Sequence, residues 1–187
     1  MILPLAFVVS AAIVGLLWGR TLKGFPAADL RSWWLAPIGL VLQVVPAPGD
    51  LDYVPLVISF VVLLIFVGLN IRTSGFILLL VGVGLNLFVI ASNLGMPVTR
   101  DALRTSGLLG SIGALESDTK HRPATEHTVL RSLGDAIGVP APFSQVVSAG
   151  DLCMYVGLAW FVVGAMPPKT VRAGRGMRLP AGSNPFP

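Results

Sequence analysis

The chain has 187 residues, of which 54% are hydrophobic and only 12% are charged, and its mean hydropathy is +0.81. Its 13 Lys and Arg residues outnumber its 9 Asp and Glu residues, which gives a formal net charge of +4. Soluble domains carry about 25% charged residues, so this composition excludes a soluble enzyme, a nucleic-acid-binding domain and a disordered tail. It predicts a small polytopic membrane protein.

Five apolar runs are long enough to be considered as membrane-spanning helices, since crossing the hydrocarbon layer takes ~20 residues. They cover residues 2–19, 32–47, 54–70, 74–94 and 146–166. The apolar residues form continuous blocks, and a helix satisfies its backbone hydrogen bonds within one such block. We therefore expect an all-α, single-domain bundle of about five transmembrane helices over residues 1–166.

The first two runs need separate interpretation. The first carries no charge and is followed by Arg20 and Lys23, whereas a cleavable signal has its basic residues first. This order favours an uncleaved first helix. The second run is near the lower limit of length and contains Pro37 and Pro46, so the alternative to a full span is a kinked or half-inserted segment.

The basic residues predict an orientation. If the first helix runs from outside to inside, the inner segments contain a single acid, Asp29, and the short outer loop contains Asp50 and Asp52 but no Lys or Arg. The basic residues of the inner segments are Arg20, Lys23, Arg31, Arg72, Lys169, Arg172, Arg175 and Arg178. Such a bias predicts an inner (plasma) membrane protein with its amino terminus outside and its carboxyl terminus in the cytoplasm. The segment 167–187 is rich in Pro, Gly and Arg and is expected to be a flexible cytoplasmic tail.

The outer loop, residues 95–145, is expected to contain short amphipathic helices. Thr99 is placed to cap a first helix that contains Asp101. A second helix is expected after Pro123, because apolar residues recur there at helical spacing: Val129, Leu130, Leu133 and Ile137.

Several motifs from the fourth run onward resemble a known family. They are Asn93 with the following Gly-Met-Pro-Val of residues 95–98, Lys120-His121, Leu133-Gly134-Asp135, and Ser-Ala-Gly-Asp at residues 148–151. Together they resemble a family of small bacterial membrane proteins known as domain of unknown function 5317. The resemblance implies a bacterial protein with several spans and no established activity.

Polar residues in or near the apolar runs are the first candidates for a functional site. Asp151 lies near the start of the fifth run, where an acid is favoured by the helix dipole, and a proton or cation relay or an ion pair is the alternative. Asn86 and Asn93 are seven residues apart and therefore share one helix face. They are expected either to bond across helices or to line a polar path. The repeated Val-Gly-Leu sequences around Gly68, Gly84 and Gly157 predict close helix–helix contacts.

The outer loop contains the remaining candidates. His121, Glu126 and His127 do not have the spacing of a helical metal-binding pair, so no metal and no cofactor are predicted. His127 and Glu126 can form an acid–base pair with Asp135 only if the loop folds over a pocket.

By exclusion, the sequence favours a non-enzymatic accessory or scaffold component of a membrane complex. The alternative is a small transporter or ion- or proton-conducting protein, expected to be a homodimer, with Asp151, Asn86 and Asn93 along its path. A third possibility is a membrane-embedded enzyme that acts on a lipid or quinone through His121, His127 or Asp135. The expected partners are the lipid bilayer and a larger complex or a second copy, and not nucleic acid.

Overall fold

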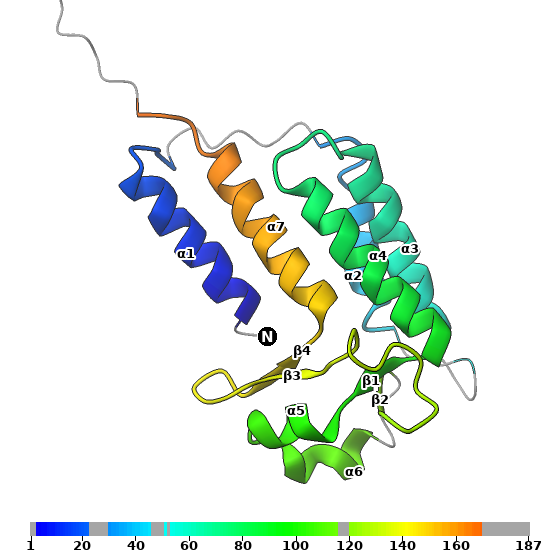
Figure 1. Cartoon of the computed structure of the whole chain (residues 1–187). Helices are drawn as coiled ribbons and strands as arrows, with labels where there is room; N and C mark the ends of the chain where they lie inside the picture. Colours follow the sequence, from blue (N-terminus) through cyan, green and yellow to red (C-terminus); the bar gives the residue numbers. More distant parts are fainter. Residues whose placement is uncertain (1–2, 23–29, 46–50, 52, 116–119, 170–187) are drawn as a thin grey trace, which may run out of the picture.

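The computed structural model describes residues 3–22, 30–45, 51, 53–115 and 120–169. Most of these residues belong to helices that run between two ends of the molecule (Figure 1). The long helices are α1 (Leu3–Leu17), α3 (Val54–Leu69), α4 (Phe76–Asn93) and α7 (Ala149–Ala165), and α2 (Leu35–Leu42) is shorter. The remaining elements lie between Met96 and Val147 and form a small unit at one end of the helices, which we call the cap.

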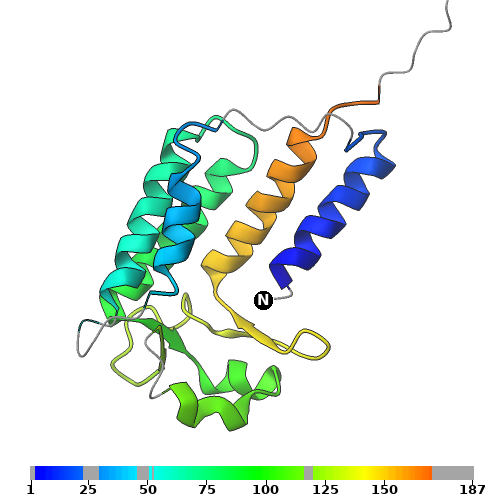
Figure 2. The ribbon, with the colours of Figure 1, turned by 180° about the vertical axis from the view of Figure 1, so that it is seen from behind.

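The helices form an open row and not a closed ring. Helix α1 packs along α7, α7 along α4, α4 along α3, and α3 along α2. Figures 1 and 2 show α1 at one edge of this row, with α7 beside it. Consequently α1 has its main helical contact on one side, and α2 lies over α3 on one face of the row (Figure 2).

Apolar composition extends along each long helix. Among the described residues, α4 is the one helix that is long and apolar enough to cross a membrane, with 18 residues. Helices α1, α3 and α7 are also apolar but are shorter, at 15, 16 and 17 residues. The expectation of about five spanning helices therefore stays a prediction.

The second apolar run differs most from its expected form. Within residues 30–45 it forms α2, a helix of eight residues, which at 1.5 Å per residue is ~12 Å long. The hydrocarbon layer is ~30 Å thick, so this helix does not reach across it. Residues 46–50, including Pro46, lie outside the described residues. The part of this run that the structure describes is therefore a short helix, and whether it spans or half-inserts into a membrane stays a prediction.

The cap corrects the expectation of an all-α protein. It contains the helices α5 (Arg100–Thr105), η2 (Leu109–Ser111) and α6 (Ile112–Leu115), and two small sheets. In one sheet, β1 (Met96–Val98) pairs in parallel with β2 (His121–Pro123). In the other, β3 (Ile137–Val139) pairs antiparallel with β4 (Gln145–Val147). The protein is therefore mostly helical, with a small mixed cap.

One of the two helices expected in the cap is present. Thr99 caps α5 as predicted, because its side chain accepts a hydrogen bond from the backbone N–H of Ala102. The second helix, expected after Pro123, is wrong: the chain forms turns there and ends in strand β3. Leu130 has a φ of 54°, which is incompatible with a continuous right-handed helix.

Helix α1 is tied to α7 at both ends. At the cap, the backbone N–H of Leu3 donates to the side-chain oxygen of Gln145, just before α7. At the other end, the Arg20 guanidinium donates to the carbonyl oxygens of Val163 and Met166. Residues 167–169 therefore do not belong to a flexible tail, since Pro168 forms a β-bridge with Arg20. The rest of the expected tail lies outside the described residues.

Candidate site between the helices and the cap

Helix α7 begins with a capping box. The Ser148 side chain accepts a hydrogen bond from the backbone N–H of Asp151, and the Asp151 carboxylate accepts one from the backbone N–H of Ser148. This reciprocal pair satisfies two N–H groups that a helix start otherwise leaves free. Asp151 therefore has the helix-start role that the sequence favoured.

The same two side chains also bind α4. Asn86 donates from its amide nitrogen to Asp151 Oδ1 at 2.9 Å, and its amide oxygen accepts from the Ser148 hydroxyl, also at 2.9 Å. Asn86 is 1% exposed and Ser148 is fully buried. This network explains how two polar side chains are accommodated inside the helical layer, because each is hydrogen-bonded. It also joins α4 to the first turn of α7.

Glycines allow α4 and α7 to approach closely enough for this contact. A Cβ atom at Gly82 would lie 2.6 Å from Met154 Cγ and 2.9 Å from the backbone nitrogen of Met154. The same Cβ atom would lie 2.5 Å from the carbonyl oxygen of Gly150, and Gly75 faces the backbone of Gly157 in the same way, seven residues along each chain segment. The expectation for Gly157 is therefore confirmed. It is wrong for Gly68, which has open space around it, and for Gly84, whose contact is of ordinary van der Waals length.

Asp135 is positioned by the backbone of the cap. Its N–H donates to the carbonyl of Pro97 and its carbonyl accepts from the N–H of Thr99, so it lies beside the end of β1. The residue is only 4% exposed. Its carboxylate oxygen Oδ2 lies 3.8 Å from His121 Nε2, at the start of β2. This distance is longer than a hydrogen bond, and no described residue donates a hydrogen bond to the carboxyl group.

The surroundings of Asp135 change its acidity. Burial raises the pKa of Asp135 from 3.8 to about 7, His121 opposes this shift, and the charge of Asp151 adds to it. The shift follows from desolvation, since a charged carboxylate is disfavoured away from water. Asp135 is therefore a group that changes its charge near neutral pH.

A cavity of about 520 Å³ connects these groups. It lies between the cap and the ends of α2, α3, α4 and α7. Its polar lining consists of Gln43, Asn86, Lys120, His121, Asp135, Ser144, Gln145, Asp151 and Tyr155, and its apolar lining of Leu56, Phe60, Ile90, Met96, Leu108 and Val146. We call this space the junction cavity. It has the mixed lining of a small-molecule site, with apolar walls and a few polar groups.

The junction cavity includes four of the six polar residues singled out from the sequence. Asn86, His121, Asp135 and Asp151 line it. Asn93 does not, because its amide group forms hydrogen bonds with the backbone of Val89 and Val129 at the end of α4. His127 is exposed in the cap. The histidine beside Asp135 is therefore His121, and no hydrogen bond or ion pair joins Asp135 to Glu126 or His127, the pairing that the sequence allowed only if the loop folded over a pocket.

Sequence reasoning missed five polar members of the cavity lining: Gln43, Lys120, Ser144, Gln145 and Tyr155. The position of Gln145 just before the fifth apolar run offered a weak signal, because polar residues at the ends of apolar runs lie near the expected boundary of the bilayer. Among the described residues, no group of three or more His, Cys, Asp or Glu side chains could hold a metal ion. The cavity therefore has no metal-binding set within that part of the chain.

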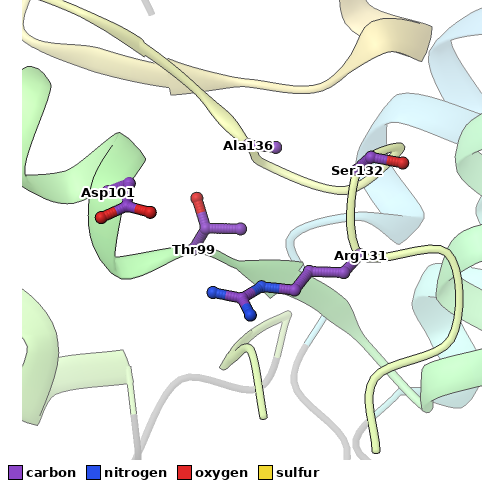
Figure 3. Close-up of a pocket in the computed structure, with 5 residues that line it drawn as sticks. All are labelled: Thr99, Asp101, Arg131, Ser132 and Ala136. Carbon is purple, nitrogen blue, oxygen red and sulfur yellow. The ribbon is translucent and has the colours of Figure 1, made fainter. Parts of the chain in front are cut away.

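A second pocket lies on the surface of the cap, lined by Thr99, Asp101, Arg131, Ser132 and Ala136 (Figure 3). Arg131 extends from its loop toward the side that Thr99 and Asp101 line. Asp101 and Arg131 are exposed to solvent, and α5 has only six residues. This pocket is therefore a shallow charged surface, in contrast to the junction cavity.

The fold and the cavity define a mostly helical protein with apolar helices, a small cap at one end and a polar site between them. Residues 27–163 match the model of the family of unknown function DUF5317. The chain belongs to this family, as the motifs in its second half indicated. Comparison with curated proteins and with solved structures found no significant match.

Proposed function

We propose that this protein is a polytopic membrane protein whose apolar helices lie in the lipid bilayer. The support comes from large apolar side chains that face outward on each long helix. Examples are Leu5 and Ile13 on α1, Ile65 on α3, Phe88 on α4 and Trp160 on α7. A water-soluble monomer rarely exposes such large contiguous apolar surfaces, whereas a bilayer solvates them.

The distribution of charge supports the orientation with the cap outside. The four described acids, Asp101, Glu126, Asp135 and Asp151, lie in the cap or in the first turn of α7. At the opposite end of the helices lie the basic residues Arg20, Arg31, Arg72 and Lys169 with no described acid, whereas the acids of the cap are balanced by five basic residues: Arg100, Arg104, Lys120, Arg122 and Arg131. Since Lys and Arg gather on the cytoplasmic side of short loops, the cap belongs on the extracytoplasmic side.

Within the membrane, the protein acts as a non-enzymatic accessory component of a larger complex. The observation that carries this proposal is the open row of helices, in which α1 packs along α7 and has no second long helix packed on it among the described elements. A small residue suits close packing with a partner helix, and α1 carries Ala12 outside the groove that it forms with α7. The uncovered edge is therefore available to another subunit.

The orientation is tested by labelling single cysteines from outside the cell. Cys153, the only native cysteine, is first replaced by serine. A membrane-impermeant maleimide should then label Glu126→Cys in intact spheroplasts, but should label Thr73→Cys only after permeabilisation. The reverse pattern would show that the cap faces the cytoplasm, and labelling of both sites in intact cells would contradict a spanning arrangement.

The accessory role is tested by isolating the tagged full chain from its native membrane in mild detergent and measuring the mass of the intact complex. A stoichiometric partner is the expected result. A lone monomer or a homodimer would contradict the accessory role and would favour transport. In that case a liposome flux assay of Asp151→Asn becomes decisive, because a relay residue would lose pH- or ion-dependent flux.

A further inference from the structure

The junction cavity contains a buried acidic group that the accessory role does not use. Asp135 is 4% exposed, lines the cavity, and receives no side-chain hydrogen bond from any described residue. A buried carboxyl group without hydrogen-bond partners is unfavourable in both its charged and its neutral form. A ligand that supplies a donor or a positive charge to this carboxyl group would remove that penalty.

The charges around Asp135 indicate which kind of ligand fits. Asp151, on α7, lines the same cavity and brings a second negative charge. Its oxygens each accept one hydrogen bond, from Asn86 and from the backbone of Ser148, which leaves further lone pairs on both oxygens. Lys120 also lines the cavity, so the two carboxylates, when ionised, leave its lining with a net charge of −1, which favours a cation over an anion.

The apolar walls indicate that this cation is organic. Leu56 and Phe60 from α3, Ile90 from α4 and Met96 from β1 line the cavity together with its polar groups. A bare metal ion would gain nothing from these side chains, and the described residues do not provide three ligands of the kinds that hold a metal. An apolar ligand body, in contrast, would bury its surface against them.

We propose that the junction cavity binds a small organic cation, with an ammonium or substituted ammonium group at Asp135 and an apolar body against Leu56, Phe60 and Ile90. His121 lies on the solvent side of this site, since its side chain is 40% exposed and that of Asp135 is 6% exposed. This site does not depend on a partner subunit, because its lining comes from one chain.

The test uses the purified full chain in detergent micelles and two probes of similar shape. Phenethylammonium carries the required charge, and 2-phenylethanol is its neutral counterpart. Saturation-transfer NMR and thermal unfolding measure binding at pH 8. We expect phenethylammonium to bind the wild type at least tenfold more tightly than 2-phenylethanol does. Equal binding of the two probes, or no binding of phenethylammonium, would overturn the proposal.

Two variants distinguish binding of the cation in the cavity from its unspecific attraction to other acidic residues or to the micelle. Asp135→Asn should lose at least tenfold in affinity for phenethylammonium. Glu126→Gln removes the same charge from an exposed position of the cap and should bind as the wild type does. If Asp135→Asn binds the cation as tightly as the wild type, the assignment to Asp135 is wrong.

The pH dependence of the wild type provides a test that does not require the variant to fold. Asp135, with a pKa of about 7, is mostly ionised at pH 8 and mostly neutral at pH 6, so cation binding should weaken about tenfold between them. The other charged or titratable groups that line the cavity are Lys120, His121, Asp151 and Tyr155. Binding of phenethylammonium that is unchanged from pH 8 to pH 6 would overturn the proposal, whether or not a partner complex exists.

Discussion

The carboxyl group of Asp135 is buried between the cap and the helices, and this burial links its charge to the stability of the protein. Its backbone is fixed beside β1 by hydrogen bonds to Pro97 and Thr99. The rise of its pKa from 3.8 to about 7 corresponds to ~4 kcal/mol, as an order of magnitude. This free energy opposes folding when the group is charged.

The sign of the pH effect follows from proton uptake. Between pH 4 and pH 7 the folded protein holds a proton on Asp135 that the unfolded chain has released, so the free energy of unfolding falls as the pH rises through this range. Asp135→Asn removes the contribution. We expect the variant to be more stable than the wild type at pH 8, with the difference disappearing toward pH 4. Thermal unfolding in detergent from pH 4 to pH 8 measures it, and a constant difference between the two proteins would contradict the burial of a titrating carboxyl group.

Ser148 has two roles, in the capping box of α7 and in the contact with Asn86. Ser148→Ala removes the acceptor for the backbone N–H of Asp151 and the hydroxyl that donates to Asn86. Loss of a cap costs about 1–2 kcal/mol, and the unpaired amide oxygen of Asn86 adds to this. Thermal unfolding should therefore show a clear decrease for Ser148→Ala and a smaller one for Ser148→Thr, which keeps the hydroxyl. Equal losses in both variants would attribute the effect to packing alone.

At the scale of secondary structure elements, the sequence predicted the helices that are long and uniformly apolar. The apolar runs 54–70 and 74–94 contain α3 and α4 with similar bounds. Thr99 and Asp151 were predictable as helix-start residues, because capping depends on neighbours within four positions. Local patterns were sufficient for these features.

Contacts between distant segments could not be predicted from the same patterns. Asn86 and Asp151 are 65 residues apart, and their pairing depends on how α7 returns along α4. The choice of His121 over His127 as the neighbour of Asp135 depends on the parallel pairing of β1 and β2 across the cap. The prediction of a helix after Pro123 was wrong for a related reason. The backbone there forms turns and then pairs, as strand β3, with strand β4.

The close contact between α4 and α7 gives a prediction with an internal control. A Cβ at Gly82 would overlap Met154, whereas a Cβ at Gly84 would lie 3.8 Å from Leu64 Cδ1. Gly82→Ala should therefore lower the free energy of unfolding by about 1–3 kcal/mol, the usual effect of overpacking. Gly84→Ala should be neutral or stabilising, because alanine favours a helix by up to ~1 kcal/mol over glycine. Unfolding of the two variants in detergent compares them, and similar effects would contradict the close approach.

At the scale of the whole molecule, the open row of helices leaves apolar surface that the chain does not cover itself. Lipid or another protein must cover this surface. Trp18 at the end of α1 and Trp160 on α7 are 72% and 59% exposed, and both line an apolar groove between these helices. In a closed bundle, side chains at such positions could have been buried by a neighbouring helix. Here Trp18 and Trp160 face outward from the chain. With the helices in the membrane they contact lipid, and in a complex formed at the α1 edge they contact a partner helix.

Tryptophan fluorescence distinguishes lipid from water at this groove. A variant that keeps Trp160 as its only tryptophan, with the other three replaced by phenylalanine, is placed in nanodiscs made with brominated acyl chains. Because Trp160 is exposed on α7, we expect strong quenching by the brominated lipid and little quenching by iodide in the buffer. A matched variant that keeps only Trp18, at the end of α1, reports how close that edge lies to the membrane surface. Quenching of Trp160 by iodide and not by brominated lipid would show that this face contacts water, which would overturn the placement of the helices in the bilayer.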